Sequence, residues 1–391
     1  MSRNPIPFDH KISTTAVIST VYPLGPAAII LMPMIVGGVV DDYGFSEQQA
    51  GMLASVEGLG LVIASIIAAF WIRKFSWTRA LFIGLLLAAA LNIVSANLSD
   101  FTGLTITRLL AGFMGGTVLA VAVVALGDNR EPDRAFGIAQ LVQGVMMFVA
   151  FAAAPGLLEA YSVSGLYYML AAASLLMMLS LFWFPDRGVK RTEIAGKSTQ
   201  GNSNTLLVCL GLFSSFLFFV NIFGFWVFIE RIGHAAQLPL ATIGLALGAS
   251  QIAAIGGALA AALASDRYGR TLPLLIVLVG QSLVLWALAG KFGVVTFFVG
   301  AGVFQALFMV AVSYQMGAIA KIDVKGRYLV MMTAAQGLGA AVGPAIAAAV
   351  IRGGNDYRGI NLMAAFFCFF SILIFFYIIR RSHQVMAAAT E

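Results

Sequence analysis

Long apolar runs joined by short polar connections occupy almost the whole of this 391-residue sequence. Each run reaches the length of about 20 residues that a helix needs to cross the hydrocarbon core of a bilayer. The pattern therefore predicts an all-α membrane protein with twelve transmembrane helices. The expected spans are 14–40, 47–72, 78–98, 101–127, 135–158, 163–184, 205–229, 240–264, 272–290, 293–319, 327–350 and 357–379.

Composition supports the same class of protein. Hydrophobic residues make up 60% of the chain and charged residues 10%, whereas a soluble domain has about 45–50% and about 25%. The mean hydropathy is +0.94, and a disordered chain would need low hydrophobicity and high net charge. A soluble domain and a disordered chain are both excluded, and little room is left for a domain outside the membrane.

The basic residues predict the orientation of the spans, because cytoplasmic loops of membrane proteins retain Lys and Arg. Of the 23 basic residues, 18 fall on one side of the predicted spans, and only Arg231, Lys291, Arg352 and Arg358 fall on the other. We therefore expect both termini in the cytoplasm and the protein in a bacterial-type inner membrane. No long basic patch with interleaved aromatic residues exists, so the net charge of +6 does not indicate a nucleic-acid partner.

The chain contains a weak internal repeat. A polar stretch at 186–204 divides it into a predicted N-terminal six-helix bundle, 1–185, and a C-terminal six-helix bundle, 205–391, with the stretch as a cytoplasmic linker. At an offset of 193 residues, the dipeptide Gln143-Gly144 falls on Gln336-Gly337, and Arg134 falls on Arg327. Two parallel repeats of this kind are typical of one class of secondary transporter. We expect two six-helix repeats around a central cavity.

Two motifs then suggest a family. The loop Asp266-Arg267-Tyr268-Gly269-Arg270 resembles the D-R-x-G-R motif of the major facilitator superfamily, and Arg108 to Gly116 resembles its R-x-x-x-G-x-x-G helix motif. The resemblance extends over the whole chain and implies transport by alternating access, with Asp266, Arg267, Gly269 and Arg270 as a gating loop. The first repeat departs from the pattern, since Arg73 and Ser76 replace the Asp and Gly of the loop. The G-x-x-x-G-P antiporter motif is incomplete around Pro155.

Two ionised residues fall deep within predicted spans, where a charge is costly and is by default a functional hypothesis. Glu57 and Arg108 differ in depth by about one helical turn, so the long Arg108 side chain can reach Glu57 if their helices face one another. One interpretation is that Glu57 carries a proton while Arg108 competes for its carboxylate or for an anionic substrate. The two alternatives are a permanent structural salt bridge between Glu57 and Arg108 and no contact between them.

Uncharged polar residues in the spans are candidates for substrate contact. Gln143 and Gln336 lie at matched depth near the midplane, where buried amides need hydrogen-bond partners; each is followed by Gly, so a packing contact between helices is the alternative. The prolines Pro23, Pro26 and Pro33 predict bends in the first span beside a cavity. Further candidates are Tyr22, Asn92, Asn221, Gln251, Gln305, Tyr314 and Gln315.

These features predict a secondary active transporter of a small organic solute, coupled to protons, and not an enzyme. No phosphate-binding G-x-x-x-x-G-K-[ST] sequence and no His/Cys cluster with metal spacing is present, so we expect no cofactor and no metal. The resemblance favours efflux by proton antiport. Uptake of an organic anion by proton symport is the alternative, and a lipid-handling flippase or a receptor-like protein is the third. The expected partners are the solute, protons and membrane lipid, with the chain as a monomer containing two buried thiols, Cys209 and Cys368.

Overall fold

The computed structural model of the chain describes residues 12–129, 131–186, 205–264, 267, 269–322, 327–351 and 356–388. These residues are mostly helical and contain no strand. The chain divides into two compact units, Met1–Ile194 (unit 1) and Ala195–Glu391 (unit 2). Unit 1 contains α1 (Ile12–Val21), η1 (Tyr22–Leu24), α2 (Ala27–Ile30), α3 (Met32–Tyr43), α4 (Glu47–Trp71), α5 (Trp77–Ala96), α6 (Phe101–Gly127), α7 (Pro132–Met178) and η2 (Leu179–Trp183); unit 2 contains α8 (Thr205–Ala235), α9 (Leu240–Ala264), α10 (Thr271–Ala287), α11 (Val294–Ile322), α12 (Arg327–Ala349) and α13 (Arg358–Ala388). The predicted linker, apart from Asp186, lies outside the described residues.

The twelve predicted spans correspond to these elements, although only nine helices in the described part are counted as long and apolar enough to cross a membrane. Three local features account for the difference. The first span is broken into short helices, α7 contains two spans, and α10 has only 17 residues. The chain is thus an all-α membrane protein with two repeats of six helical segments.

The break in the first span follows its prolines, as the sequence predicted. Proline lacks the N–H that continues a helix and clashes with the preceding turn. The helix accordingly stops at Val21, before Pro23, and a new short helix starts after Pro26. Pro33 lies in the first turn of α3, where a missing N–H costs nothing. The bent segment packs on α6, because a Cβ added to Gly25 would lie 2.6 Å from the Cβ of Leu119.

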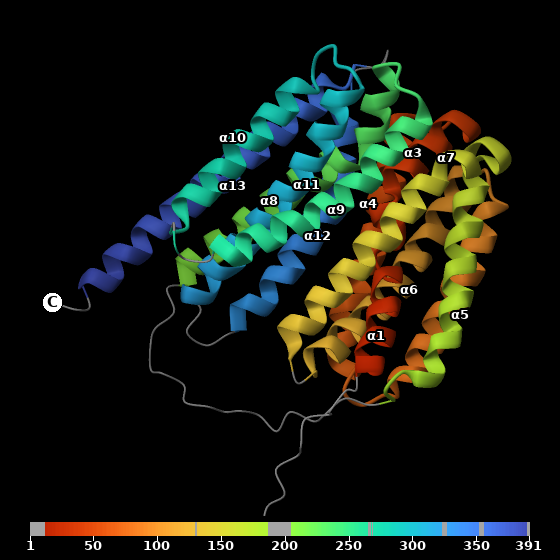
Figure 1. Ribbon diagram of the computed structural model, residues 1–391, viewed down its shortest axis with the longest axis horizontal. Coiled ribbons are helices and arrows are strands. Elements are labelled where there is room, and N and C mark those ends of the chain that lie inside the picture. The colour runs from red at the N-terminus through yellow and green to blue at the C-terminus, as the bar shows by residue number, and fades with distance from the viewer. Residues whose placement is uncertain are drawn as a thin grey trace, which may run out of the picture. The chain divides into compact units, whose positions relative to one another are not determined.

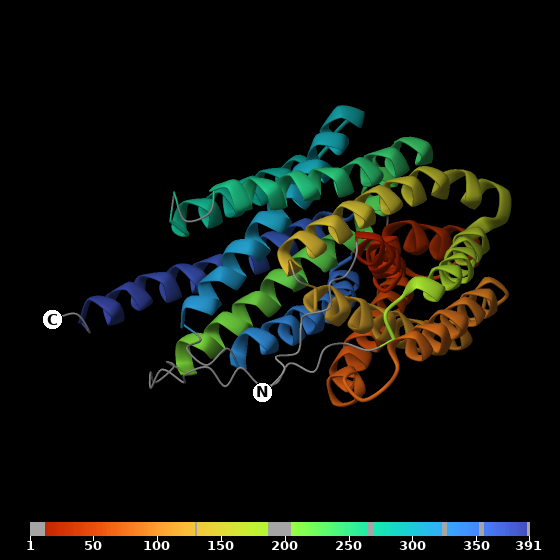
Figure 2. The same ribbon diagram turned by 60° about the horizontal axis from the view of Figure 1, so that its bottom comes forward.

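The long helix α7 consists of two arms that run in opposite directions, as Figures 1 and 2 show by its turn from yellow to yellow-green. The reversal occurs at Ser162, whose φ of 57° and ψ of −165° are not helical. Asp42 stabilises the start of the second arm, because its Oδ2 accepts a hydrogen bond of 2.6 Å from the Val163 N–H. The arms, 132–161 and 163–178, therefore serve as the fifth span and most of the sixth.

Small residues set the closest helix contacts in both units. In unit 1 α4 packs along α6, and in unit 2 α9 packs along α11. A Cβ added to Gly112 would lie 2.1 Å from the Glu57 carbonyl oxygen, and one added to Gly257 would lie 2.1 Å from the Ala306 carbonyl oxygen. Only glycine permits such approach, as is common between membrane helices. The second and fourth helical segments of each unit therefore approach closely at a glycine, Gly112 of the fourth segment in unit 1 and Gly257 of the second segment in unit 2.

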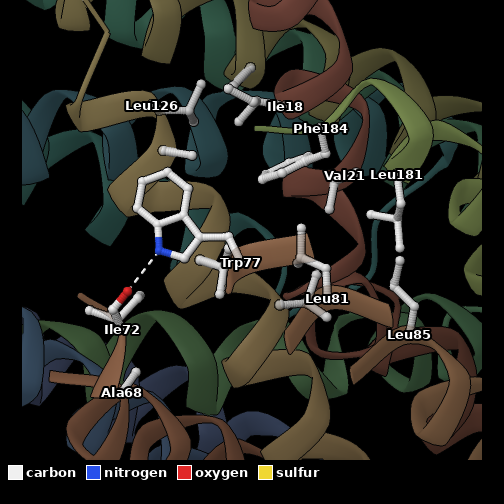
Figure 3. Packing of buried hydrophobic residues seen from close by; sticks show 14 of the residues in the cluster. Ile18, Val21, Ala68, Ile72, Trp77, Leu81, Leu85, Leu126, Leu181 and Phe184 are labelled. Atoms are coloured by element: carbon white, nitrogen blue, oxygen red, sulfur yellow. Dashed lines mark hydrogen bonds between the residues drawn. The ribbon is translucent and has the colours of Figure 1, made fainter. Parts of the chain in front are cut away.

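One end of unit 1 is closed by an apolar cluster around Trp77 (Figure 3). The indole ring is buried, and its Nε1 donates a 2.7 Å hydrogen bond to the Ile72 carbonyl, so its polar group has a partner. Polar contacts reinforce this end: Arg73 pairs with Asp128 at the end of α6, and Ser76 donates to Asp186. The loop between α4 and α5 is thereby joined to the ends of α6 and η2.

Large apolar side chains are exposed along many helices, as expected where lipid replaces water as the surrounding solvent. Phe70, Phe182 and Trp286 are among them. Cys368 is buried, but Cys209 is exposed on α8, and neither forms a disulfide. The prediction of two buried thiols was therefore wrong for Cys209, because an apolar run looks alike in sequence whether a residue faces lipid or protein.

Candidate functional site

The centre of unit 1 contains the ion pair that the sequence made possible. The Arg108 Nη2 of α6 donates to the Glu57 Oε1 of α4 over 2.7 Å. The side chains are only 1% and 2% exposed, respectively. Since removing a charge from water costs several kcal/mol even after relaxation, the two groups depend on one another for compensation.

The glycine motif of α6 explains why the two residues meet. Arg108 and Gly112 lie one turn apart on the same face of α6. Because Gly112 has no side chain, the Glu57 backbone lies directly against this face. Gly115 continues the same face and contacts Gly25 of the first span, as a Cβ there would lie 2.6 Å from the Gly25 carbonyl oxygen. The motif therefore brings α4 and the bent first span to Arg108.

Arg108 has further partners on two other elements. Its Nη1 donates to Asn92 Oδ1 over 2.8 Å and to Ser95 Oγ over 3.3 Å, both on α5. Its guanidinium carbon lies 5.0 Å from the ring centre of Tyr167, on the second arm of α7, a favourable cation–π distance. By contrast, Glu57 Oε2 and Arg108 Nε make no hydrogen bond with any described residue. Arg108 is held firmly, while Glu57 keeps one oxygen without a protein partner.

A small cavity adjoins the pair. Its volume is about 30 Å³, which is room for about two water molecules at about 10–15 Å³ each. Glu57, Arg108 and Asn92 contribute its polar surface, and the bent part of the first span from Leu24 to Ile29 contributes much of its wall. Water in this cavity can therefore reach a carboxylate in the middle of the membrane span.

The described residues of unit 2 include a group of buried amides at its centre and no central ion pair. Asn221 Nδ2 of α8 donates to Gln281 Oε1 of α10 over 3.0 Å, and Cys368 Sγ of α13 donates to the same oxygen over 3.4 Å. Ser215 and Gln315 are also completely buried, with a long contact of 3.5 Å between Ser215 Oγ and Gln315 Oε1. These groups hydrogen-bond in either direction but carry no charge.

Comparison with known proteins identifies the family. The sequence profile of the Major Facilitator Superfamily matches residues 18–208 and 211–390. The chain belongs to this superfamily. Its motifs in α6 and in the loop before α10 are therefore motifs of its own family, and its fold is that of a transporter.

Solved structures support the same fold. The nucleoside transporter NupG is 14% identical with a TM-score of 0.72, covering 94% of this chain and 98% of NupG. The D-xylose–proton symporter is 14% identical with a TM-score of 0.72, covering 92% and 96%. A bacterial homologue of the human lysosomal transporter Spinster, inward-facing and unoccupied, is 13% identical with a TM-score of 0.68, covering 94% and 96%. No curated protein matches the chain by sequence.

The superfamily's loop motif is partly described. Gly269 has a φ of +64°, a left-handed conformation that favours glycine and explains its place in the motif. Arg270 lies over Gly317 of α11, where an added Cβ would be 3.2 Å from the Arg270 Nη2. Arg267 is exposed, and Asp266 lies outside the described residues. The described part of the loop is thus anchored on α11.

The structure places the other predicted contact residues in the two units separately. Tyr22 and Gln143 are half-buried in unit 1, whereas the predicted residues of unit 2 are buried. One side-chain atom of each of Gln143, Gln251 and Gln336 is buried without a hydrogen-bond partner among the described residues. The buried predicted residues of unit 2 are Asn221, Gln251, Gln305, Tyr314, Gln315 and Gln336.

Sequence reasoning missed four side chains that build these sites, Ser95, Tyr167, Ser215 and Gln281. Ser95 lies three residues after Asn92 on the same face of α5, and this spacing was a usable signal. Tyr167 comes from a distant arm and is marked by no local pattern. Gln281 was overlooked although an amide in a span should have been a candidate. Unit 2 also buries Glu230 and Arg231, but these lie near the end of α8.

Proposed function

We propose that this superfamily member is a proton-coupled secondary transporter of small organic solutes, in which Glu57 binds the coupling proton. One observation carries the proposal: Glu57 is a buried carboxylate with one oxygen on Arg108 and the other without a protein partner, next to a cavity of water size. A group of this kind can accept a proton from water and lose it again. A purely structural pair would be expected to use both oxygens.

The charge of Arg108 suggests the substrate class. When Glu57 takes up a proton, the ion pair ends and the buried guanidinium retains only Asn92, Ser95 and Tyr167, all neutral. A buried cation without a counter-ion is strongly unfavourable. An anionic group such as a carboxylate, entering with the proton, restores neutrality. Proton and organic anion then bind together, which is the chemistry of a symporter.

This argument favours uptake over efflux. In an antiporter for lipophilic cations, the cation would replace the proton on Glu57 while lying within a few ångströms of the Arg108 charge. Like charges at that distance repel strongly in a medium of low dielectric constant. One solved structure of the same fold is a D-xylose–proton symporter, so proton coupling is compatible with this architecture. Of the alternatives, symport of an organic anion agrees best with the geometry of unit 1.

Entry of the anion requires movement, because the cavity beside Arg108 holds only water-sized groups. The wall most suited to movement is the bent segment from Leu24 to Ile29, where the prolines have already interrupted helical hydrogen bonding. Displacement of this segment would expose Arg108 and Glu57 together. We assign a gating role to the loop of Arg267, Gly269 and Arg270 in unit 2, in the change between the two conformations of alternating access.

The neutral amides complete the proposal. Gln143 in unit 1 and Gln336 in unit 2 occupy equivalent positions of the repeat, and one side-chain atom of each is buried without a hydrogen-bond partner among the described residues. Amides can donate to and accept from the uncharged part of a solute. We propose that they, with Gln251 and Gln305, set affinity, whereas Glu57 and Arg108 set coupling and charge preference.

The test is transport by the purified protein in proteoliposomes with an imposed pH gradient. Labelled organic anions and lipophilic cations are offered separately, and wild type is compared with Glu57→Gln. The matched control is Glu159→Gln, the same change at an exposed carboxylate of unit 1. We expect the proton gradient to drive accumulation of an anion by the wild type and by the control. Glu57→Gln should lose accumulation but retain exchange of labelled for unlabelled solute.

Each other outcome has a defined meaning. Gradient-driven accumulation that survives Glu57→Gln would overturn the role of Glu57. Expulsion of a lipophilic cation in exchange for protons would restore the antiporter prediction and remove the anion argument. Absence of flux for every solute under both gradient directions would favour the flippase or receptor alternative and leave Glu57 and Arg108 as a structural pair.

A further inference from the structure

A second cavity, with a mostly apolar wall, lies in unit 2 where α10 ends and α11 and α13 begin. Its volume is about 770 Å³. The helices α10 and α13 run side by side there (Figure 1), joined by a 2.9 Å hydrogen bond from Asn361 Nδ2 to the Leu285 carbonyl. Because the cavity lies at helix ends, it falls at the level of the lipid headgroups.

Two cations line this cavity without a carboxylate partner. Lys291 and Arg358 both contribute to its wall and are both exposed, and neither forms a salt bridge with a described residue. Arg358 Nε donates to the Ala289 carbonyl over 3.3 Å, which orients the guanidinium and leaves its two Nη groups available. The wall itself contains no acidic residue. Asp356 lines the adjoining cavity, which Lys291 and Arg358 also line, and its Oδ1 accepts from the Arg358 backbone N–H over 3.1 Å.

The helix termini add to the positive potential. The N-termini of α11 and α13 point at this region, and helix N-termini favour anions. The C-terminus of α10 would oppose them, but Asn361 donates to the Leu285 carbonyl in its last turn, and Arg358 donates to the Ala289 carbonyl just beyond the helix. The site therefore favours an anion with oxygen acceptors, for which the planar guanidinium is well suited.

The rest of the wall is apolar and open to the bilayer. Trp286, at the end of α10, is 77% exposed, and Leu362, one turn into α13, is 73% exposed. Exposed Trp at a helix end is typical of the headgroup region, and an exposed Leu next to it fits an acyl chain. A free solute would not need this combination of a cationic pocket with an apolar lateral opening.

We propose that this cavity binds the headgroup of an anionic phospholipid, with its phosphate on Lys291 and Arg358 and its acyl chains along Trp286 and Leu362. Basic residues are scarce on the predicted non-cytoplasmic side of the membrane. The sequence has four there, and two of them line this cavity. A lipid so bound ties α10, the shortest span, to α13. The proposal is independent of the coupling role of Glu57, which lies in unit 1.

The test is native mass spectrometry of the full chain in detergent, with phosphatidylglycerol, phosphatidylcholine or inorganic phosphate added. The variant is Lys291→Gln/Arg358→Gln. Its control is Lys74→Gln/Arg79→Gln, which removes two exposed cations from unit 1. We expect wild type and control to retain phosphatidylglycerol in preference to phosphatidylcholine. The variant should bind phosphatidylglycerol about 30-fold more weakly, since it loses two interfacial cations, each contributes about 1 kcal/mol, and 1.4 kcal/mol is tenfold.

Equal retention of phosphatidylglycerol by variant and wild type would overturn the proposal, as would loss of the lipid from the control to the same extent. If inorganic phosphate displaces the lipid at equal concentration, the site binds a free anion and the role of the acyl chains is wrong. Should the variant fold poorly, wild type alone decides: a soluble short-chain phosphatidylglycerol must bind more tightly than inorganic phosphate.

Discussion

The buried centres of the two units differ in charge although their helices pack alike. At the offset of 193 residues, Glu57 corresponds to Ser250 and Arg108 to Ala301, so the ion pair has no counterpart in unit 2. Unit 2 instead buries the neutral group of Asn221, Gln281 and Cys368. The charged residues that are buried in the described part of unit 2, Glu230 and Arg231, lie near a helix end.

This difference separates what makes the fold from what makes the chemistry. Close approach through Gly112 in unit 1 and Gly257 in unit 2 is the same device, so both units keep it for packing. The titratable pair is not needed for packing, because unit 2 forms the corresponding helix contact without it. A structural feature present in only one of two repeats is therefore a candidate for function, and we assign proton coupling to unit 1 and neutral solute contacts largely to unit 2.

The largest effect should come from removing one residue of the Glu57–Arg108 ion pair and leaving the other in place. Arg108→Gln leaves Glu57 buried without a cation, and we expect a loss of about 3–5 kcal/mol of stability. The double variant Glu57→Gln/Arg108→Gln removes both charges, as unit 2 does naturally, and should recover most of that loss. Thermal unfolding in detergent, followed by size-exclusion chromatography, measures both.

The recovered double variant must still fail to accumulate solute, since Glu57 is no longer there to bind the coupling proton. A double variant as unstable as Arg108→Gln would show that the ion pair is required for folding. In that case the comparison with unit 2 would lose its meaning, because the two units would not be built on the same packing alone.

A slightly smaller effect tests the shared packing. Gly112→Ala and Gly257→Ala each place a Cβ 2.1 Å from a backbone oxygen of the partner helix, and overpacking of this kind costs about 1–3 kcal/mol. Both should lower the unfolding temperature to a similar degree. The controls are Gly137→Ala and Gly256→Ala, whose Cβ atoms meet open space. A large loss in only one unit would show that the repeats do not pack alike.

The sequence alone was sufficient to predict those parts of the fold that follow from one simple physical rule. The twelve spans follow from apolar run length, and the break after Val21 follows from Pro23 and Pro26. The reach from Arg108 to Glu57 followed from depth, but contact required the helices to face one another, and that depends on Gly112 meeting a backbone oxygen. Burial also could not be read from apolar runs, as Cys209 shows.

Partners contributed by distant segments were beyond sequence reasoning. Tyr167 reaches Arg108 only because α7 reverses at Ser162, a residue that no turn motif marks. The Asp128 partner of Arg73 likewise depends on how the helix ends meet in space. In each case the residue types were suggestive, whereas the pairing is a property of the tertiary structure.

A more moderate effect distinguishes the neutral network of unit 2 from the charged one of unit 1. Gln281→Leu removes the acceptor shared by Asn221 and Cys368. Hydrogen bonds between membrane helices contribute about 0.6–1.7 kcal/mol, so we expect a loss of about 1 kcal/mol and unchanged proton-driven transport. A loss as large as that of Arg108→Gln, or a loss of coupling, would place essential chemistry in unit 2.

The smallest effect concerns the loop ion pair of unit 1. Arg73 donates to Asp128 through Nη1 and, over 2.9 Å, through Nη2, and Arg73 is 42% exposed. At the offset of 193 the corresponding positions carry Asp266 and Lys321, the same two charges in reverse order, whose side chains lie outside the described part of unit 2. The Asp128 side chain is 5% exposed, so the pair is screened by solvent only on its Arg73 side. If only opposite charge matters, Arg73→Asp/Asp128→Lys should unfold within about 1 kcal/mol of wild type.

The single change Arg73→Asp serves as the control for this swap, because it brings two carboxylates together and should be less stable than the double variant. The transport rate shows whether the pair only holds the loop in place or also takes part in the conformational change. If the swapped protein folds normally and transports at the wild-type rate, the pair holds the loop through charge alone and its direction is neutral. If it folds normally but transports more slowly, the order of charges matters to the conformational change, and the two repeats differ at their loops as well as at their centres.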